Sequence, residues 1–231
     1  MPQRARLLVL GRQGAGKGTQ GAILAGRLGI PHVSTGNMFR AEVAAGTPLG
    51  NRVSHYLDEG ALVPDDLVLE LVASQLGGEE AHAAGYLLDG FPRTLRQGQA
   101  LFEALGPDAV DLAIDLDVPT EVVLPRLASR RVCEGCGTAA TVAPGAPEGG
   151  SCEACGGRLV RRADDTDEAI AKRLALYDVE TGPLRAWLDE IGVLTVVDGT
   201  GEPAEVAARM VAAVEAHLPE AFWEVDVPDA S

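Results

Sequence analysis

The stretch GRQGAGKG, from Gly11 to Gly18, restricts the possible folds of this chain more than any other feature. It has the spacing G-x-x-x-x-G-K, it follows the short apolar run Arg6–Leu10, and apolar residues recur at helical spacing from Lys17 onward. A strand, a glycine-rich loop and a helix in this order form a phosphate-binding loop, in which backbone N–H groups and the helix N-terminus face the phosphates. A simple glycine-rich turn with an exposed lysine is the alternative, and the flanking strand and helix favour phosphate binding.

Further apolar runs predict more strands at Tyr86–Leu88, Leu112–Leu116 and Val193–Val197, and long helical patterns lie between them. Alternating strands and helices predict an α/β fold with a parallel sheet. In such sheets ligands bind beyond the carboxyl ends of the strands, where we expect Gly11 and Asp89.

Two stretches interrupt this alternation. Residues 34–63 show helical patterns without a strand signal, and residues 132–165 are rich in Gly, Pro and Cys without a helical period. We call them the first and the second insertion. The remaining residues, 1–33, 64–131 and 166–231, are expected to form the core domain.

The second insertion contains every cysteine of the chain, in two C-x-x-C pairs: Cys133, Cys136, Cys152 and Cys155. Four thiolates at this spacing fit a closed, structural Zn²⁺ site, and metal binding would supply the folding energy that a segment with so few large apolar residues lacks. Bound iron, a redox-active pair and a nucleic-acid-binding zinc ribbon are the alternatives. Metal-binding thiols also indicate a reducing, cytoplasmic setting.

The charge and the hydropathy of the chain argue against several classes of function. The net charge of −15 argues against broad binding to nucleic acids or to anionic membranes. The first apolar run is too short for a signal peptide, and no stretch approaches the ~20 apolar residues of a membrane span. We therefore expect a globular protein that binds a small anion in a locally basic cleft.

The phosphate loop departs from its commonest form, because Gly18 follows Lys17 and the hydroxyl comes only at Thr19. Mg²⁺ would then be held mainly by the nucleotide and by water, with Asp89 as the expected anchor of that water. An aspartate at the end of a strand can instead cap the following turn.

Five motifs occur in the order found in adenylate kinases: GRQGAGKGTQ, STGNMFR, LLDGFPRT, RLASRRV and RRADDTDEAIAKRL. From Leu7 to about Leu218 the chain resembles this family, and its second insertion is similar to the zinc-bearing lid of the long bacterial form. The resemblance implies a P-loop NTPase-type core, a helical insertion that binds the nucleoside monophosphate and a small zinc-ribbon-like lid. It also implies a monomer that converts ATP and AMP into two ADP with Mg²⁺.

The resemblance implies roles for individual residues as well. The catalytic set is Lys17, Asp89, Arg93, Arg126, Arg130, Arg162 and Arg173. The ATP-binding set is Gly14, Ala15, Gly16, Lys17, Gly18, Thr19, Arg130, Ala139, Ala140 and Gly201. The AMP-binding set is Thr35, Arg40, Ala61, Leu62, Val63, Gly90, Phe91, Pro92, Arg93, Gln97, Arg162 and Arg173. Elementary chemistry supports the arginines, because phosphoryl transfer depends on positioned cations and guanidinium groups suit bidentate phosphate contacts.

Three features depart from the family pattern. Asn37 stands where the family usually has Asp, which predicts weaker coupling to Mg²⁺. Ala139 and Ala140 stand where zinc-lid relatives commonly carry Thr-Tyr, which predicts weaker binding of ATP. Pro125 lies inside a predicted helix, so a kink could re-aim Arg126, which would otherwise share a helical face with Arg130.

Two other functions stay open at this point. One is a different nucleoside monophosphate kinase that accepts UMP, CMP or GMP, or a GTP-dependent AMP kinase. The other is a non-catalytic zinc protein that senses nucleotides, and the full set of arginines argues against it.

Overall fold

The computed structural model describes residues 4–76, 84–143, 149–162 and 164–219. In this part of the chain a five-stranded parallel sheet has the order β2-β3-β1-β4-β8. Its strands are β1 Arg6–Gly11, β2 His32–Ser34, β3 Tyr86–Asp89, β4 Leu112–Asp117 and β8 Leu194–Asp198. The predicted parallel α/β core is confirmed. The sequence did not predict β2, because this edge strand has only the half-buried residues His-Val-Ser and hence no apolar run.

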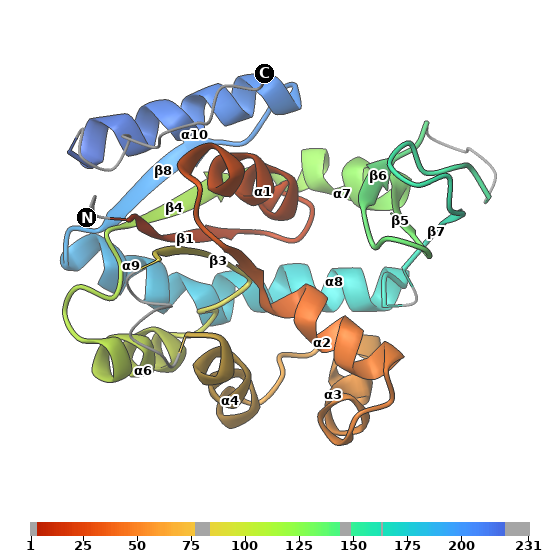
Figure 1. Cartoon of the computed structure of the whole chain (residues 1–231), viewed down its shortest axis with the longest axis horizontal. Helices are drawn as coiled ribbons and strands as arrows, with labels where there is room; N and C mark the ends of the chain where they lie inside the picture. Colours follow the sequence, from red (N-terminus) through yellow and green to blue (C-terminus); the bar gives the residue numbers. More distant parts are fainter. Residues whose placement is uncertain (1–3, 77–83, 144–148, 163, 220–231) are drawn as a thin grey trace.

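Helices cover both faces of the sheet (Figure 1). On one face α1 (Lys17–Leu28) packs against α10 (Pro203–His217). The other face carries α4 (Asp65–Leu76), α6 (Leu95–Leu105) and α9 (Gly182–Glu190). Each face of the sheet therefore has its own apolar core.

Strand β1 shows how the two cores divide the sequence. Leu7 and Val9 lie in the core with α1 and α10, whereas Leu8 and Leu10 lie in the core with α6 and α9. Successive side chains of a strand point to opposite faces, so a continuous apolar run is what a sheet covered on both faces requires.

The first insertion is helical, as predicted. It contains α2 (Thr35–Ala44) and α3 (Pro48–Asp58), and the side chain of Thr47 caps α3 by accepting a 3.0 Å hydrogen bond from the backbone N–H of Gly50. The two helices meet so closely at Gly50 that a Cβ atom there would lie 2.2 Å from the carbonyl oxygen of Glu42. Only glycine permits this approach.

The second insertion follows α7 (Thr120–Ser129) and forms a small antiparallel sheet of order β6-β5-β7 among the described residues. Its strands are β5 Arg130–Cys133, β6 Ala139–Thr141 and β7 Leu159–Val160. In Figure 1 both insertions project from the same end of the core, with α8 (Asp167–Leu176) running between them. Helix α8 continues through a π-helical turn, η1 (Tyr177–Thr181), into α9.

Pro125 lies inside α7, as the sequence indicated. The expectation that Arg126 and Arg130 share a helical face is wrong, because α7 ends at Ser129 and Arg130 already has the extended backbone of β5. Within the described ranges, no helix is both long and apolar enough to cross a membrane.

Candidate active site

A cavity of about 650 Å³ lies beyond the carboxyl ends of β1 and β3, with lining residues from the core and from both insertions. Its lining comes from the phosphate loop, the first insertion, the segment after β3, the second insertion and the segments around η1 and the start of α10. All but one of the residues predicted to bind nucleotide or to act in catalysis line this cavity. Segments far apart in the sequence therefore meet at one site.

Phe91 is the exception. Its side chain is fully buried in the core on the α6 and α9 face, and it does not line the cavity. Its neighbours Gly90 and Pro92 do line it. The large apolar ring is better buried with other apolar side chains than exposed in a polar cleft, so Phe91 anchors the segment that carries the lining residues.

The phosphate loop has the conformation that its glycines permit. Gly14 and Gly16 have φ angles of 85° and 101°, a region that favours glycine, and a Cβ atom on Gly14 would lie 2.9 Å from Leu127. Gly16 caps α1, so the first N–H groups of this helix point toward the cavity.

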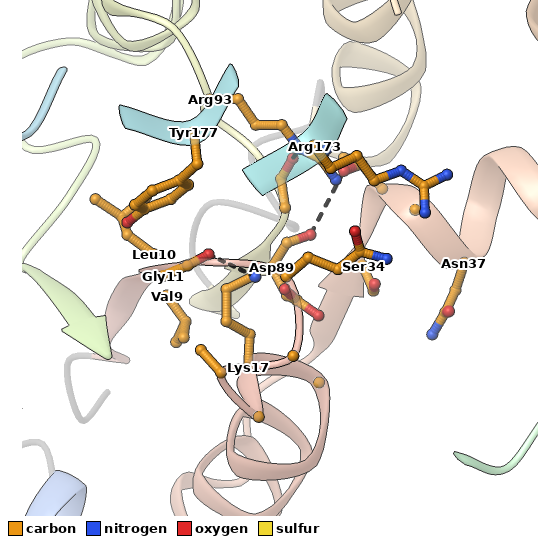
Figure 2. A pocket seen from close by; sticks show the side chains of 18 of the residues that line it. Val9, Leu10, Gly11, Lys17, Ser34, Asn37, Asp89, Arg93, Arg173 and Tyr177 are labelled. Atoms are coloured by element: carbon orange, nitrogen blue, oxygen red, sulfur yellow. Dashed lines mark hydrogen bonds between the residues drawn. The ribbon is translucent and has the colours of Figure 1, made fainter. Parts of the chain in front are cut away.

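Lys17 lines the cavity, and its Nζ donates to the carbonyl oxygens of Gly11 at 2.6 Å and Arg12 at 3.0 Å. Burial lowers the pKa of Lys17 to about 8, with Arg93 and Arg130 adding to the shift and Asp89 and Asp115 opposing it. Figure 2 shows Lys17, Asp89 and Arg93 pointing toward one another. An anionic ligand here would restore the charge balance around the lysine.

Asp89 ends β3 and is 7% exposed. Burial opposes its ionisation, but His32, with Nε2 3.7 Å from Asp89 Oδ2, and the charges of Lys17 and Arg93 outweigh this effect and lower its pKa. The carboxylate is therefore ionised near neutral pH. It lies 3.5 Å from the position of a Cβ atom on Gly18, beside the phosphate loop, as the sequence predicted.

Arg93 reaches the cavity from the segment after β3. Its Nε donates to the carbonyl oxygen of Gly90 at 2.8 Å, and its backbone N–H donates to Oε1 of Gln97, also at 2.8 Å. Gln97 in turn donates to Oδ1 of Asp65 at 2.7 Å. Burial lowers the pKa of Arg93, with Asp89 opposing and Arg173 adding to the shift.

Two buried carboxylates hold arginines at the junction between the second insertion and α8. Asp165 accepts from both Nε and Nη2 of Arg130, at 3.0 Å and 2.5 Å, and from Nη1 of Arg173 at 3.3 Å. Asp164 pairs with Arg173 at 2.9 Å. The arrangement orients guanidinium groups at the edge of the cavity.

Further positive charge surrounds this junction. Arg40 of α2 lies 3.5 Å from Asp164, so a residue of the first insertion meets the second one. Burial lowers the pKa of Arg162 to about 10, and the nearby charges of Arg40 and Arg130 add to the shift. An acidic protein thus has a locally basic cleft, as the sequence predicted.

Arg126 lies beside the phosphate loop and the loop before α10. Its guanidinium donates to the carbonyl oxygens of Gly199 at 3.1 Å, Ala15 at 3.4 Å and Gly201 at 3.4 Å. Pro125 therefore does not prevent Arg126 from lining the cavity near Gly201. Ala139 and Ala140 of β6 line the same cavity with small side chains.

The four cysteine Sγ atoms lie within 4.8 Å of one another, with Cys133 3.4 Å from Cys155 and Cys136 3.7 Å from Cys152. Metal–sulfur bonds of about 2.3 Å in a tetrahedron give sulfur–sulfur distances of about 3.8 Å. Backbone N–H groups of Gly135 and Gly157 donate to the sulfurs of Cys133 and Cys155, as they would to thiolates. The cluster is compatible with one bound metal ion such as zinc.

Sequence reasoning missed several residues that line the cavity, among them Gln13, Tyr177 and Thr181. Gln13 occupies a variable position of the phosphate loop, where its Nε2 donates to Asp165 at 3.0 Å. Tyr177 and Thr181 belong to η1, and no short sequence pattern predicts a π-helical turn. Only the three-dimensional arrangement could reveal them.

Comparison with known proteins agrees with this geometry. Residues 9–193 match the family model of adenylate kinase. The chain is 44% identical over 203 residues to the adenylate kinase of Clostridium tetani, an alignment that covers 87% of this chain and 94% of that protein. It is 44% identical over 214 residues to that of Thermodesulfovibrio yellowstonii (91% and 99% covered) and 43% identical over 213 residues to that of Symbiobacterium thermophilum (91% and 98% covered). Since the family model matches most of the chain and these relatives cover nearly all of it, this protein belongs to the adenylate kinase family.

Proposed function

We propose that this protein is an ATP:AMP phosphotransferase, which reversibly transfers the terminal phosphoryl group of ATP to AMP and so maintains the balance of adenine nucleotides. One observation carries the proposal most directly. A phosphate loop and six arginines from both insertions and the core line one cavity: Arg40, Arg93, Arg126, Arg130, Arg162 and Arg173. A triphosphate and a monophosphate brought together need such a surplus of fixed cations, because both are anionic.

The ATP side of the site is assigned to the phosphate loop and its neighbours. Backbone N–H groups from Gly14 to Thr19 would bind the phosphates, with the ammonium of Lys17 close to the outer oxygens. The adenine would lie against the backbone of Gly201, close to Arg126, Ala139 and Ala140. The closeness of Arg126 to Gly199 and Gly201 supports this assignment.

The AMP side is assigned to the first insertion and the segment after β3. Arg40 and Arg93 would bind the AMP phosphate, and Gln97 would contact the adenine. Thr35, Gly90, Pro92 and residues 61–63 line the same cavity and support this assignment. Arg162 and Arg173 would reach the phosphates from the other side.

The chemistry needs little covalent participation by the protein. The attacking AMP phosphate is already anionic, so Asp164 and Asp165 act as holders of arginines and not as general bases. Arg130 and Arg173 would leave Asp165 in part for the transferring group, whose charge grows on its equatorial oxygens. The remaining task is to hold the two nucleotides in line and to exclude water.

Two metal ions belong to the proposal. Mg²⁺ would accompany ATP and neutralise charge on its phosphates, with the carboxylate of Asp89 orienting coordinated water. Zn²⁺ would be held by Cys133, Cys136, Cys152 and Cys155 as a structural ion, since four sulfur ligands leave no open position for substrate. The 3.4 Å and 3.7 Å sulfur pairs support a tetrahedral site.

We further propose a core of residues 1–33, 64–131 and 166–231, an AMP-binding domain of residues 34–63 and a lid of residues 132–165. The reduced thiols fit a cytoplasmic enzyme, and family likeness suggests a monomer. Sedimentation at the mass of a single 24.0 kDa chain would support the last point.

The decisive experiment measures ADP formation from ATP–Mg²⁺ with AMP, GMP, CMP and UMP separately. We expect fast turnover with AMP alone. Turnover with another monophosphate would make the protein a different member of the nucleoside monophosphate kinases. Replacing ATP with GTP tests whether ATP is the phosphoryl donor. Tight ATP binding without turnover of any acceptor would refute the enzyme and favour a nucleotide sensor.

A further inference from the structure

The π-helical turn η1 lies between α8 and α9 and faces the cavity through Tyr177, Glu180 and Thr181. Such turns break the regular hydrogen bonding of a helix, and they are frequent at functional sites. Two of these side chains make hydrogen bonds that no role assigned so far explains. They connect η1 to the sheet and to Arg93.

The first hydrogen bond joins Thr181 to Arg93. The hydroxyl of Thr181, a residue only 4% exposed, donates to the backbone carbonyl oxygen of Arg93 at 2.9 Å. The backbone N–H of Arg93 donates to Gln97 on α6. Both backbone groups of this arginine are therefore fixed, one from α6 and the other from η1.

The second hydrogen bond joins η1 to the sheet. The hydroxyl of Tyr177 donates to Oδ1 of Asp115 at 2.9 Å, and Arg185 pairs with the other oxygen of this carboxylate at 2.5 Å. Asp115 is 2% exposed and lies opposite Leu10 in the pairing of β4 with β1. Figure 2 shows Tyr177 reaching toward the end of β1 at Leu10 and Gly11. The start of η1 is thus fixed beside the phosphate loop.

Arg12 of the phosphate loop also contacts η1. Arg12 pairs with Asp178 at 2.7 Å, and its guanidinium lies 5.7 Å from the centre of the Tyr177 ring. Asp178 is 60% exposed at its side chain, so this pair contributes little on its own. It adds a second connection between η1 and the loop that would bind ATP.

We propose that Thr181 is a positioning residue for Arg93, and that η1, held on Asp115 by Tyr177, fixes this arginine relative to the phosphate loop. The inference rests on the proposed function, in which Arg93 binds the acceptor phosphate. The Thr181 hydroxyl acts through Arg93 and does not touch the reacting atoms. Its contribution is geometric, because small displacements of reacting groups reduce phosphoryl transfer steeply.

The test compares Thr181→Val with Thr181→Ser and with Val179→Ala. Valine keeps the shape of threonine but removes the donor, and serine restores the donor. Val179 lies on the same turn and is 69% exposed, so its truncation controls for a general effect on η1. Affinities for AMP and for ATP are measured separately by calorimetry, alongside kcat and both KM values.

We expect Thr181→Val to weaken AMP binding and to lower kcat/KM for AMP about tenfold, since a buried carbonyl loses its partner. The affinity for ATP should stay within about twofold of the original, because the contacts of Lys17 and the loop glycines are unchanged. Thr181→Ser and Val179→Ala should behave like the unaltered enzyme. Tyr177→Phe, which removes the bond to Asp115, should shift the AMP parameters in the same direction by about threefold.

Several results would overturn the inference. They are unchanged AMP binding in Thr181→Val, an equal loss of ATP and AMP affinity, or a serine variant as impaired as the valine variant. Should the valine variant not fold, Tyr177→Phe decides the question by the same split between AMP and ATP. Failure of the proposed function looks different, because the unaltered protein itself would then form no ADP from AMP.

Discussion

The lowered pKa of Lys17 predicts that the affinity for ATP depends on pH. Burial, reinforced by Arg93 and Arg130, brings this pKa from 10.5 to about 8. Binding of a polyphosphate requires the charged ammonium. ATP must therefore bind most tightly to the protonated form and draw a proton onto Lys17 wherever the free protein has lost it.

The magnitude follows from the two pH values chosen. With a pKa of about 8, the charged fraction of Lys17 falls from about nine-tenths at pH 7 to about one-tenth at pH 9. The dissociation constant for ATP–Mg²⁺ should therefore rise about tenfold over this range. A lysine of ordinary pKa would change it by only about 3%.

Calorimetry on the metal-loaded protein, in two buffers with different enthalpies of ionisation, checks both the change in affinity and the proton uptake. At pH 8 we expect uptake of about half a proton for each ATP bound. Lys17→Met is the control, and its weaker binding should lack this pH dependence. An affinity that stays constant between pH 7 and pH 9, or an equal fall in Lys17→Met, would refute the reasoning.

The same pKa gives stability the opposite trend. Lys17 binds its proton less tightly in the folded state than in the unfolded state, so the unfolded chain holds more protons between pH 8 and pH 10.5. The contribution of Lys17 to the free energy of unfolding should therefore rise with pH in this window. Denaturant titrations of the ligand-free protein and of Lys17→Met at several pH values measure this contribution as the difference between their free energies of unfolding.

Three further predictions follow from other parts of the site. Removal of the metal by a chelator, or Cys152→Ser, should unfold the small β5–β7 sheet and lower the melting temperature and kcat/KM for ATP. An unchanged melting temperature after complete metal removal would contradict a structural ion. Asp165→Asn leaves Arg130 and Arg173 without their shared carboxylate. Chemical denaturation should therefore show that the free energy of unfolding falls by about 3–5 kcal/mol. A fall of less than about 1 kcal/mol would show that Asp165 holds these arginines only weakly in the nucleotide-free protein. Ala140→Tyr should tighten ATP binding about threefold to tenfold by adding an aromatic contact. Ala140→Leu is the control for added apolar area alone. Equal gains in affinity in both variants would exclude a specific role of the aromatic ring.

Short sequence patterns were sufficient to predict those parts of the fold that depend on residues close together in the chain. The apolar run Arg6–Leu10 and the glycines after it predicted β1 and the phosphate loop. The apolar run, the spacing of the glycines and the helical pattern that follows all indicate the same strand–loop–helix unit. The two C-x-x-C pairs likewise predicted one sulfur cluster. Strand β2 escaped prediction because three half-buried edge residues carry no such pattern.

The fate of individual side chains was predictable only where the motif itself fixes the backbone. Gly14, Gly16 and Lys17 line the cavity as expected, whereas Phe91, in the same motif as Gly90 and Pro92, points into the core. Spacing alone also misplaced Arg130, because the end of α7 at Ser129 changes the backbone from helix to strand. A motif predicts which segment is present, and packing decides which of its side chains face the ligand.

The sequence by itself determined that this chain has a phosphate loop on a parallel α/β sheet, a sulfur cluster in an inserted segment and a basic cleft in an acidic protein. Those properties follow from residue types at short spacings. Only the tertiary structure decided how the arginines are held by Asp164 and Asp165, and that Thr181 and Tyr177 connect Arg93 with the sheet. These contacts join residues far apart in the chain, so their energies depend on packing that no local pattern records.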